Sequence, residues 1–107
     1  MIVRAGETIY PTEIEEVLFC HPHISNVQIF GVPSQALGEE VAAWIKLEEG
    51  AAATGEEILQ YCRTKLPASC LPRYIKFVRE FPMTLLGKVQ KFRMREMAIK
   101  EYGLEPD

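Results

Sequence analysis

The chain has 107 residues, 48% of them hydrophobic, and its 12 Lys and Arg against 15 Asp and Glu give a net charge of −3. This length and apolar content predict one compact domain, and the modest net charge argues against disorder. No apolar run approaches the roughly 20 residues of a bilayer-spanning helix, and the first residues lack the apolar stretch of a secretion signal. We therefore expect a cytoplasmic protein without a transmembrane segment.

The charges are divided unequally along the sequence. Residues 1–57 carry two basic and ten acidic side chains, whereas residues 58–107 carry ten basic and five acidic ones. Seven basic residues and a single acid, Glu80, lie between Arg73 and Arg95. An acidic chain is a poor candidate for nucleic-acid binding, but a local basic segment suits one phosphorylated ligand. The alternative is a solvent-exposed basic face that pairs with the acidic half.

The first part of the sequence predicts a short β-hairpin followed by a helix. Residues 2–4 and 8–10 have the composition of two strands joined by a turn that contains glycine. Pro11 suits the first position of a helix, which should continue over 12–20. The spacing of its apolar residues predicts one buried stripe and an acidic outer face, with Ile14, Val17 and Leu18 inside and Glu13, Glu15 and Glu16 outside.

The middle of the sequence predicts two strands and a second helix. Residues 24–32 and 40–47 contain β-branched and aromatic side chains, with a loop between the two segments. Thr54 has the position of a helix N-cap, and the helix that follows should run to about Lys65. In the second strand we expect alternate side chains to share one face of a sheet, namely Val41, Ala43, Ile45 and Leu47.

The last part predicts a strand, a long loop and a final helix. Residues 74–78 alternate as a strand does, and residues 81–89 have the composition of a loop. Residues 92–102 predict a helix that Gly103 ends, before a polar tail. The order of elements is that of an α+β domain, in which a short N-terminal β-hairpin precedes a roughly three-stranded sheet packed with three helices.

Several residues that often carry chemistry have a plain structural interpretation here. His21 and His23 have no acidic or thiol partner at ligand spacing, so we expect no metal site. Trp44 lies within a predicted strand and is expected in the core. Neither disulfides nor a zinc site are expected from the three scattered cysteines, Cys20, Cys62 and Cys70.

The loop 81–89 combines Gly87 with Lys88, next to the basic final helix. Glycine lets the backbone approach a ligand closely, so Gly87 is a candidate binding residue. Lysine is a flexible point charge that suits an oxygen that gains negative charge during a reaction. The G-x-x-x-x-G-K-[ST] phosphate loop is absent. On residue chemistry alone, a solvent-exposed lysine in a turn remains the alternative.

Three segments in this order resemble the C-terminal lid domain of adenylate-forming enzymes, which include acyl-CoA synthetases, peptide-synthetase adenylation domains and luciferases. The first segment is IVRAGETIYPTEIE at 2–15, similar to I-K-x-G-G-x-x-I-x-P-x-E-I-E. The second is GVP at 31–33 with LGEEVAAWI at 37–45, similar to G-x-x-D…G-E-x-x-x-A-x-V. The third is LPRYIKFV at 71–78 with FPMTLLGKVQK at 81–91, similar to P-x-x-x-x-F-V-x-x-x-P-x-T-x-x-G-K-x-x-K/R. The GKVQKF stretch is most similar to medium- or fatty-acyl-CoA synthetases.

The resemblance implies that residues 1–107 are a mobile lid and that a large N-terminal adenylation domain lies outside the chain. Family members activate a carboxylate with ATP to an acyl-adenylate, and in synthetases the thiol of CoA then displaces AMP. The implied co-substrates are ATP and CoA, with Mg²⁺ bound mainly through ATP and the N-terminal domain. The implied partners are that domain and a carboxylic acid of the fatty class. We expect the isolated lid to be inactive.

The resemblance also assigns roles to individual residues. By motif position Lys88 is the adenylation lysine, whose charge stabilises the negative charge that develops when the carboxylate attacks the α-phosphate. In a second orientation of the lid, the opening hairpin with Gly6 and Glu7 helps to form the tunnel for the pantetheine arm of CoA. The position where some relatives receive the adenine of CoA is occupied by Leu37 and Gly38.

Two departures from the family pattern limit what carries over. The frequent Gly-Gly-Glu-Asn of the hairpin is Ala-Gly-Glu-Thr at 5–8, so contacts of the usual Asn are not expected. The frequent aromatic–Lys pair is Ser69-Cys70, so a phosphate contact is not expected there either. Two alternatives stay open: the lid of a peptide-synthetase-type domain that loads a carrier protein, and a stand-alone α+β binding module.

Overall fold

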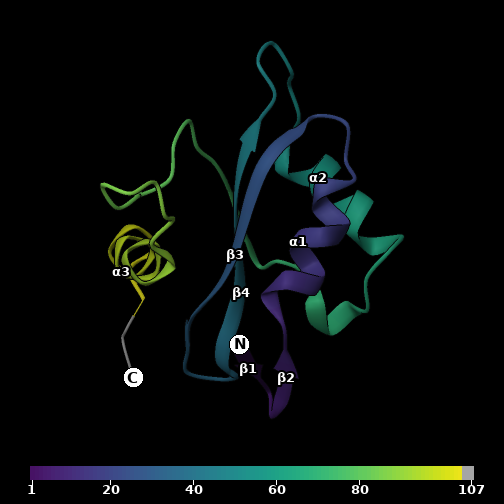
Figure 1. Cartoon of the computed structure of the whole chain (residues 1–107). Helices are drawn as coiled ribbons and strands as arrows, with labels where there is room; N and C mark the ends of the chain where they lie inside the picture. The colour runs from purple at the N-terminus through teal and green to yellow at the C-terminus, as the bar shows by residue number, and fades with distance from the viewer. Residues whose placement is uncertain (105–107) are drawn as a thin grey trace.

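The structure is a computed structural model that describes residues 1–104 of the chain (Figure 1). The predicted polar tail at 105–107 lies outside the described residues. Within the described part, no helix has the length and apolar character needed to span a membrane. The elements in chain order are β1 (Ile2–Arg4), β2 (Glu7–Ile9), α1 (Pro11–Phe19), β3 (Ile24–Ser34), β4 (Gly38–Leu47), α2 (Gly55–Arg63), a 3₁₀ turn (Ala68–Cys70), β5 (Tyr74–Phe77) and α3 (Lys91–Tyr102).

The strands of both the hairpin and the domain centre form one mixed sheet. Its order is β2-β1-β4-β3, and β5 also pairs with β4. Strands β3 and β4 are antiparallel, with Ile29 opposite Ala43, whereas β5 runs parallel to β4. Strand β1 joins β4 where Arg4 lies opposite Gly38. The predicted α+β class with three helices is confirmed, and the hairpin extends the central sheet instead of standing apart from it.

Both faces of this sheet are buried. Helices α1 and α2 cover one face and α3 covers the other (Figure 1). Strand β4 therefore contributes side chains to two cores, and the predicted shared face of its alternate residues is confirmed. Trp44 is only 1% exposed in the core beneath α3, as the sequence predicted. Burial of apolar area on both sides stabilises the position of each helix against the strands.

The helix ends follow local signals in the sequence. Pro11 begins α1, and the Thr54 hydroxyl caps α2 by accepting a hydrogen bond from Glu57 N at 3.1 Å. Helix α3 ends at Gly103, whose φ of 66° is left-handed and carries little cost for glycine. Helix α3 begins one residue earlier than predicted, at Lys91. The start of α3 matters for the site, because it follows directly on the loop with Lys88.

The prediction that Glu15 lies on the outer face of α1 is wrong. Its side chain is only 14% exposed. One carboxylate oxygen, Oε2, accepts hydrogen bonds from Ile29 N at 2.8 Å and from Lys91 Nζ at 2.7 Å. The apolar stripe at Ile14 and Leu18 is buried as predicted. Helical periodicity could not show the position of Glu15, because the countercharge lies 76 residues away in the sequence.

Candidate functional site

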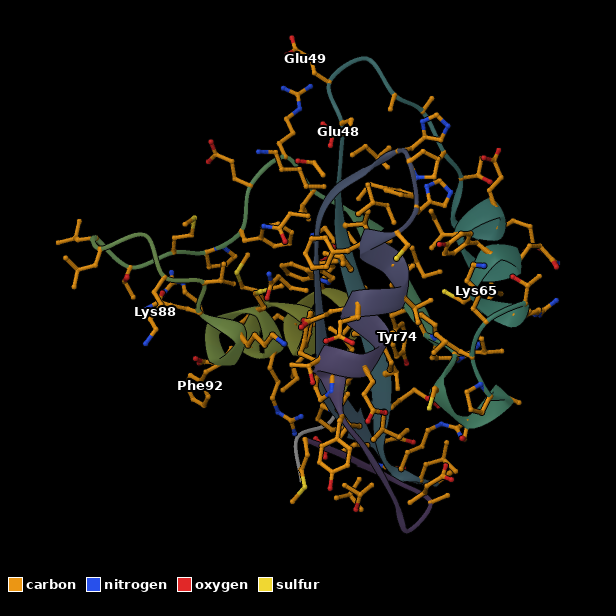
Figure 2. All side chains as sticks on the ribbon, turned by 45° about the vertical axis from the view of Figure 1, so that its right-hand side comes forward. Glu48, Glu49, Lys65, Tyr74, Lys88 and Phe92 are labelled. Carbon is orange, nitrogen blue, oxygen red and sulfur yellow. The ribbon has the colours of Figure 1, made fainter. Side chains whose placement is uncertain are left out.

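The loop with Lys88 leaves the sheet after β5 and returns at the start of α3, on the α3 side of the molecule (Figure 2). Phe81 anchors the first end of the loop, because its side chain is buried in the core beneath α3 and is 7% exposed. The two ends are joined by a hydrogen bond from Gln90 N to Pro82 O at 2.9 Å. The base of the loop is therefore fixed, although the loop lies at the surface.

A threonine and a glycine determine the turn that presents Lys88. Thr84 Oγ1 accepts a hydrogen bond from Lys88 N at 3.1 Å, and Thr84 N donates to Lys88 O at 2.8 Å. Gly87 has a φ of 83°, a left-handed value that other residues adopt only at a cost. The T-x-x-G-K spacing thus has a local structural explanation, since both residues set the direction in which Lys88 leaves the turn.

The tip of this loop is open to its surroundings. Lys88 is exposed, and the ion pairs within residues 1–104 do not include it. Leu85 and Leu86 are also fully exposed. The loop therefore presents a positive charge and two apolar side chains at the surface of the domain.

The residues that the sequence associated with CoA lie together at the hairpin. Ala5 and Gly6 have φ values of 51° and 80°, so they form the tight turn between β1 and β2. Ala5 N donates to Leu37 O at 2.8 Å, which places the β3–β4 loop beside this turn. Gly38 then pairs with the end of β1. Glu7 is the first residue of β2, one residue before the predicted start of this strand, and its side chain is exposed.

The structure does not bring the Lys88 loop to the hairpin. In both views the β1–β2 hairpin lies at the lower end of the molecule, with the Lys88 loop well above it and to the left (Figures 1 and 2). The candidate residues therefore form two separate groups, one around Lys88 and one around Gly6 and Leu37.

Two cations hold α3 against the rest of the domain. Lys91 and Arg95 are four residues apart, so they lie on the same face of the helix. Lys91 Nζ lies 2.7 Å from Glu15 Oε2 in α1, and Arg95 Nη1 lies 2.9 Å from Glu39 Oε2 in β4. Glu39 Oε1 also accepts a hydrogen bond from the backbone of β1. Sequence analysis missed both carboxylates, because each is partnered only in the folded chain.

These contacts explain part of the cluster of basic residues between Arg73 and Arg95. Two of its seven cations are paired with carboxylates from the acidic half, as the alternative interpretation supposed. A third, Lys76, pairs with Glu101 at 2.7 Å within the basic half itself, and its ammonium lies 4.6 Å from the centre of the Trp44 ring. Three of the seven cations thus have structural ion pairs, whereas Lys88 is among the four that take part in none of the ion pairs within residues 1–104.

A pocket of about 460 Å³ lies between the end of β3 and the end of α3. Its lining includes Glu40, whose Oε1 is already bound by Arg4 Nε at 2.7 Å. Arg73 also lines it, and its guanidinium lies 6.0 Å from the centre of the Tyr74 ring. Arg73 is the charged group in this lining that could attract an anion.

Other titratable groups offer little chemistry. Burial, with a smaller effect of the nearby His23, lowers the pKa of His21. Burial also raises the pKa of the Cys62 thiol to about 11, which keeps this thiol protonated and unreactive. Residues 1–104 contain no group of three or more His, Cys, Asp or Glu side chains arranged to hold a metal ion.

Comparison with known proteins adds a family and named relatives. The family model described as "AMP-binding enzyme C-terminal domain" matches residues 13–88. The chain is 46% identical over 104 residues to the putative acyl-CoA synthetase YngI of Bacillus subtilis, covering 97% of the chain and 19% of that protein. It is 48% identical over 104 residues to the mitochondrial medium-chain acyl-CoA ligase ACSF2 of Danio rerio, covering 97% and 17%.

Solved structures give the same fold. The ATP-bound MatB from Rhodopseudomonas palustris matches with a TM-score of 0.88 and 29% identity, over 94% of this chain and 20% of that one. The Mycobacterium tuberculosis fatty acyl CoA synthetase matches with a TM-score of 0.86 and 33% identity, again over 94% and 20%. The chain thus spans no more than about a fifth of the length of these relatives.

Proposed function

The chain belongs to the family of AMP-binding enzyme C-terminal domains, and we propose that it is the lid of an AMP-forming acyl-CoA synthetase. It works with a large N-terminal adenylation domain that binds ATP and a carboxylic acid. In the first step the carboxylate attacks the α-phosphate of ATP, giving acyl-AMP and pyrophosphate. In the second step the thiol of CoA attacks the acyl carbon and AMP leaves. The names of the relatives favour an acid of the medium-chain or fatty class.

The observation that carries this proposal is the exposed, unpaired Lys88 on a loop whose base is fixed. The first step builds up negative charge on phosphate oxygens, and a positioned cation that arrives without its own countercharge stabilises that charge. Gly87 allows the loop to approach the nucleotide closely. The family resemblance places Mg²⁺ mainly on ATP and the N-terminal domain, and this chain takes no part in its binding in our proposal.

The second group of residues serves the second step. The turn at Gly6, followed by Glu7, lines the path of the pantetheine arm, and the adjacent loop at Leu37 and Gly38 lies near the adenine of CoA. The separation of this group from Lys88 supports a lid with two orientations, each of which presents one group to the active site.

The test compares the two half-reactions in the full-length enzyme that contains this chain. Adenylation is measured as octanoate-dependent exchange of labelled pyrophosphate into ATP, and thioester formation as the reaction of synthetic octanoyl-AMP with CoA. We expect Lys88→Ala to slow adenylation by about 10²-fold or more and to change thioester formation by less than about threefold. Lys100→Ala, which removes an exposed cation in the last turn of α3, is the control. Equal effects on both half-reactions would reject this role of Lys88.

The same enzyme separates the remaining candidates. A peptide-synthetase-type lid transfers the acyl group to the pantetheine of a carrier protein and not to free CoA. Acyl transfer from octanoyl-AMP to CoA therefore supports the synthetase, and transfer to a carrier protein alone supports the alternative. If the full-length gene product contains no adenylation domain and forms no acyl-AMP, the chain is a stand-alone binding module.

A further inference from the structure

A partly buried ion pair fixes the place where the Lys88 loop meets α3. Lys91 is the first residue of α3 and follows Lys88 by three residues. Its Nζ lies 2.7 Å from Glu15 Oε2, and the same oxygen accepts a hydrogen bond from Ile29 N at 2.8 Å. Ile29 is fully buried at the centre of β3. Through Glu15, the start of α3 is therefore tied both to α1 and to the backbone of β3, an edge strand of the sheet.

The first turn of α3 has no local stabilisation of its end, although Met94, the fourth residue of the helix, is buried in the core beneath it. The N-cap residue, Gln90, makes no side-chain capping hydrogen bond, and the first turn contains no acidic residue. A cation at the N-terminal end of a helix is also unfavourable, because the helix dipole is positive there. Lys91 is thus a poor choice for the stability of α3 alone. Its partner Glu15 supplies from another element the negative charge that this helix end favours.

The ion pair also determines how freely the loop can move. The other end of the loop is anchored by the buried Phe81, and the two ends are joined between Gln90 and Pro82. If Lys91 were released, the first turn of α3 could unwind and the closed base would lose one of its supports. The Lys88 ammonium would then sample more positions relative to the domain, without any change in the residue itself.

We infer that Lys91, held by Glu15, is a positioning residue for Lys88 in the adenylation step. This inference rests on the proposed function of Lys88. Positioning of a charged group within a fraction of an ångström is worth a large factor in rate, and a displacement of about 1 Å can cost up to about 10²-fold. Because Lys88 acts in the first half-reaction, loss of the ion pair should slow that half-reaction selectively.

The experiment uses three variants at this pair in the full-length enzyme, with the octanoate assays described above. For Lys91→Met and for Glu15→Gln, we expect the kcat of adenylation to fall by about 5- to 20-fold, with the KM for ATP within about twofold. Octanoyl-AMP conversion by CoA should stay within about twofold. Lys91→Arg keeps the charge and should restore adenylation to within about threefold of the wild type.

A matched control is available on the same helix. Glu101→Gln breaks the ion pair with Lys76, which has the same 2.7 Å separation but lies at the other end of α3. We expect this variant to leave both half-reactions unchanged. If it slowed adenylation as much as Lys91→Met does, the effect would belong to α3 stability in general, and the inference would be overturned.

The remaining outcomes are also decisive. Unchanged adenylation in Lys91→Met and Glu15→Gln, or a parallel loss of both half-reactions, contradicts the positioning role while leaving the role of Lys88 intact. Normal adenylation in Lys88→Ala contradicts the proposed role of Lys88 itself, on which the inference about Lys91 rests. If Lys91→Met fails to fold, Glu15→Gln tests the inference on its own. The amide oxygen of this variant can still accept the hydrogen bond from Ile29 N, so the variant keeps one of the contacts that support the fold.

Discussion

Glu39 joins the first strand to the last helix through Arg95. Glu39 Oε2 lies 2.9 Å from Arg95 Nη1, and Glu39 Oε1 accepts a hydrogen bond from Val3 N at 2.9 Å. Arg95 also donates to Gly31 O at 2.7 Å. One carboxylate therefore connects the hairpin, for which we propose a role in the CoA step, with the helix that follows the Lys88 loop. Both proposed sites of the domain are thus linked to α3.

The close approach of Glu39 depends on the absence of a side chain at Gly31. A Cβ at this position would lie 2.6 Å from Glu39 Oε2 and 3.2 Å from Ile2 Cγ1. The carboxylate must shift to avoid this clash, and a shift of Oε2 weakens its contact with Arg95. We therefore expect Gly31→Ala to lower the free energy of unfolding of the 107-residue chain by about 1–3 kcal/mol, as measured by urea denaturation.

Gly55→Ala provides the control for this change. A Cβ at Gly55 would meet only Ile75 atoms at 3.9 Å, which is an ordinary contact, and Gly55 begins α2. We expect this variant to be neutral or slightly more stable, since alanine loses less backbone entropy in a helix. Equal destabilisation by the two substitutions would show that the Glu39 contact is not the cause.

In the hairpin turn, we expect substitutions at two adjacent residues to change the free energy of unfolding in opposite directions. Ala5 has a φ of 51°, which costs a residue with a Cβ about 1–2 kcal/mol, whereas the added backbone entropy of glycine costs about 0.5–1 kcal/mol. Ala5→Gly should therefore raise the free energy of unfolding by up to about 1 kcal/mol. Gly6→Ala should lower it by up to about 1 kcal/mol, because the strain at its φ of 80° exceeds the gain in backbone entropy and the new Cβ meets nothing within 4 Å. Urea denaturation of both variants measures the two effects, and shifts of the same sign would contradict this account of the turn.

Local sequence signals predicted the elements well but not their long-range contacts. Pro11, Thr54 and Gly103 each mark a helix end through their own backbone preferences, so no distant partner is needed to recognise them. Glu15 was misplaced because its environment is created by Lys91 from the far end of the chain. The parallel pairing of β5 with β4 is equally a property of the fold, since it depends on the crossover through α2.

The candidate site was less predictable from local sequence signals than the helices and strands were. A glycine followed by a lysine in a loop is chemically unspecific, and only the family resemblance singled out Lys88. The structure adds the local reason for the motif, because the Thr84 hydroxyl and the left-handed Gly87 shape the turn. The adjacency of Gly6 and Leu37 also required the fold, as the two residues belong to different loops.

Trp44 and Tyr102 make a hydrogen bond at the edge of the core beneath α3. Trp44 Nε1 donates to Tyr102 Oη at 3.2 Å, and Trp44 is 1% exposed. Tyr102→Phe would leave this buried donor without a partner but would keep the ring stacked on Tyr74, where the centroids are 4.6 Å apart. We expect a loss of about 1–3 kcal/mol in the free energy of unfolding by urea denaturation. Tyr10→Phe, at a residue that is 53% exposed, should change it by less than about 0.5 kcal/mol. A loss no greater than that of the Tyr10 control would mean that the Trp44 hydrogen bond contributes little.

The buried thiol of Cys62 should make stability depend on alkaline pH. Burial raises its pKa from 9.0 to about 11. Above about pH 9 the unfolded chain loses this proton while the folded chain keeps it, so the unfolded state binds fewer protons and stability falls as pH rises toward 11. The contribution is fully present below pH 9, and its complete loss is worth up to about 2–3 kcal/mol, since each pKa unit corresponds to about 1.4 kcal/mol.

Cys62→Ala isolates this effect from the tyrosines and lysines that titrate in the same range. Removal of the buried sulfur should lower the free energy of unfolding by a constant amount at every pH, because of the cavity that it leaves. The difference between the wild type and this variant should then shrink by about 1 kcal/mol between pH 8 and pH 10, as the wild type alone pays for keeping its thiol protonated. Urea denaturation of both chains at pH 8, 9 and 10 measures this difference. A difference that stays constant across the three pH values would show that the Cys62 thiol does not control the alkaline stability of the domain.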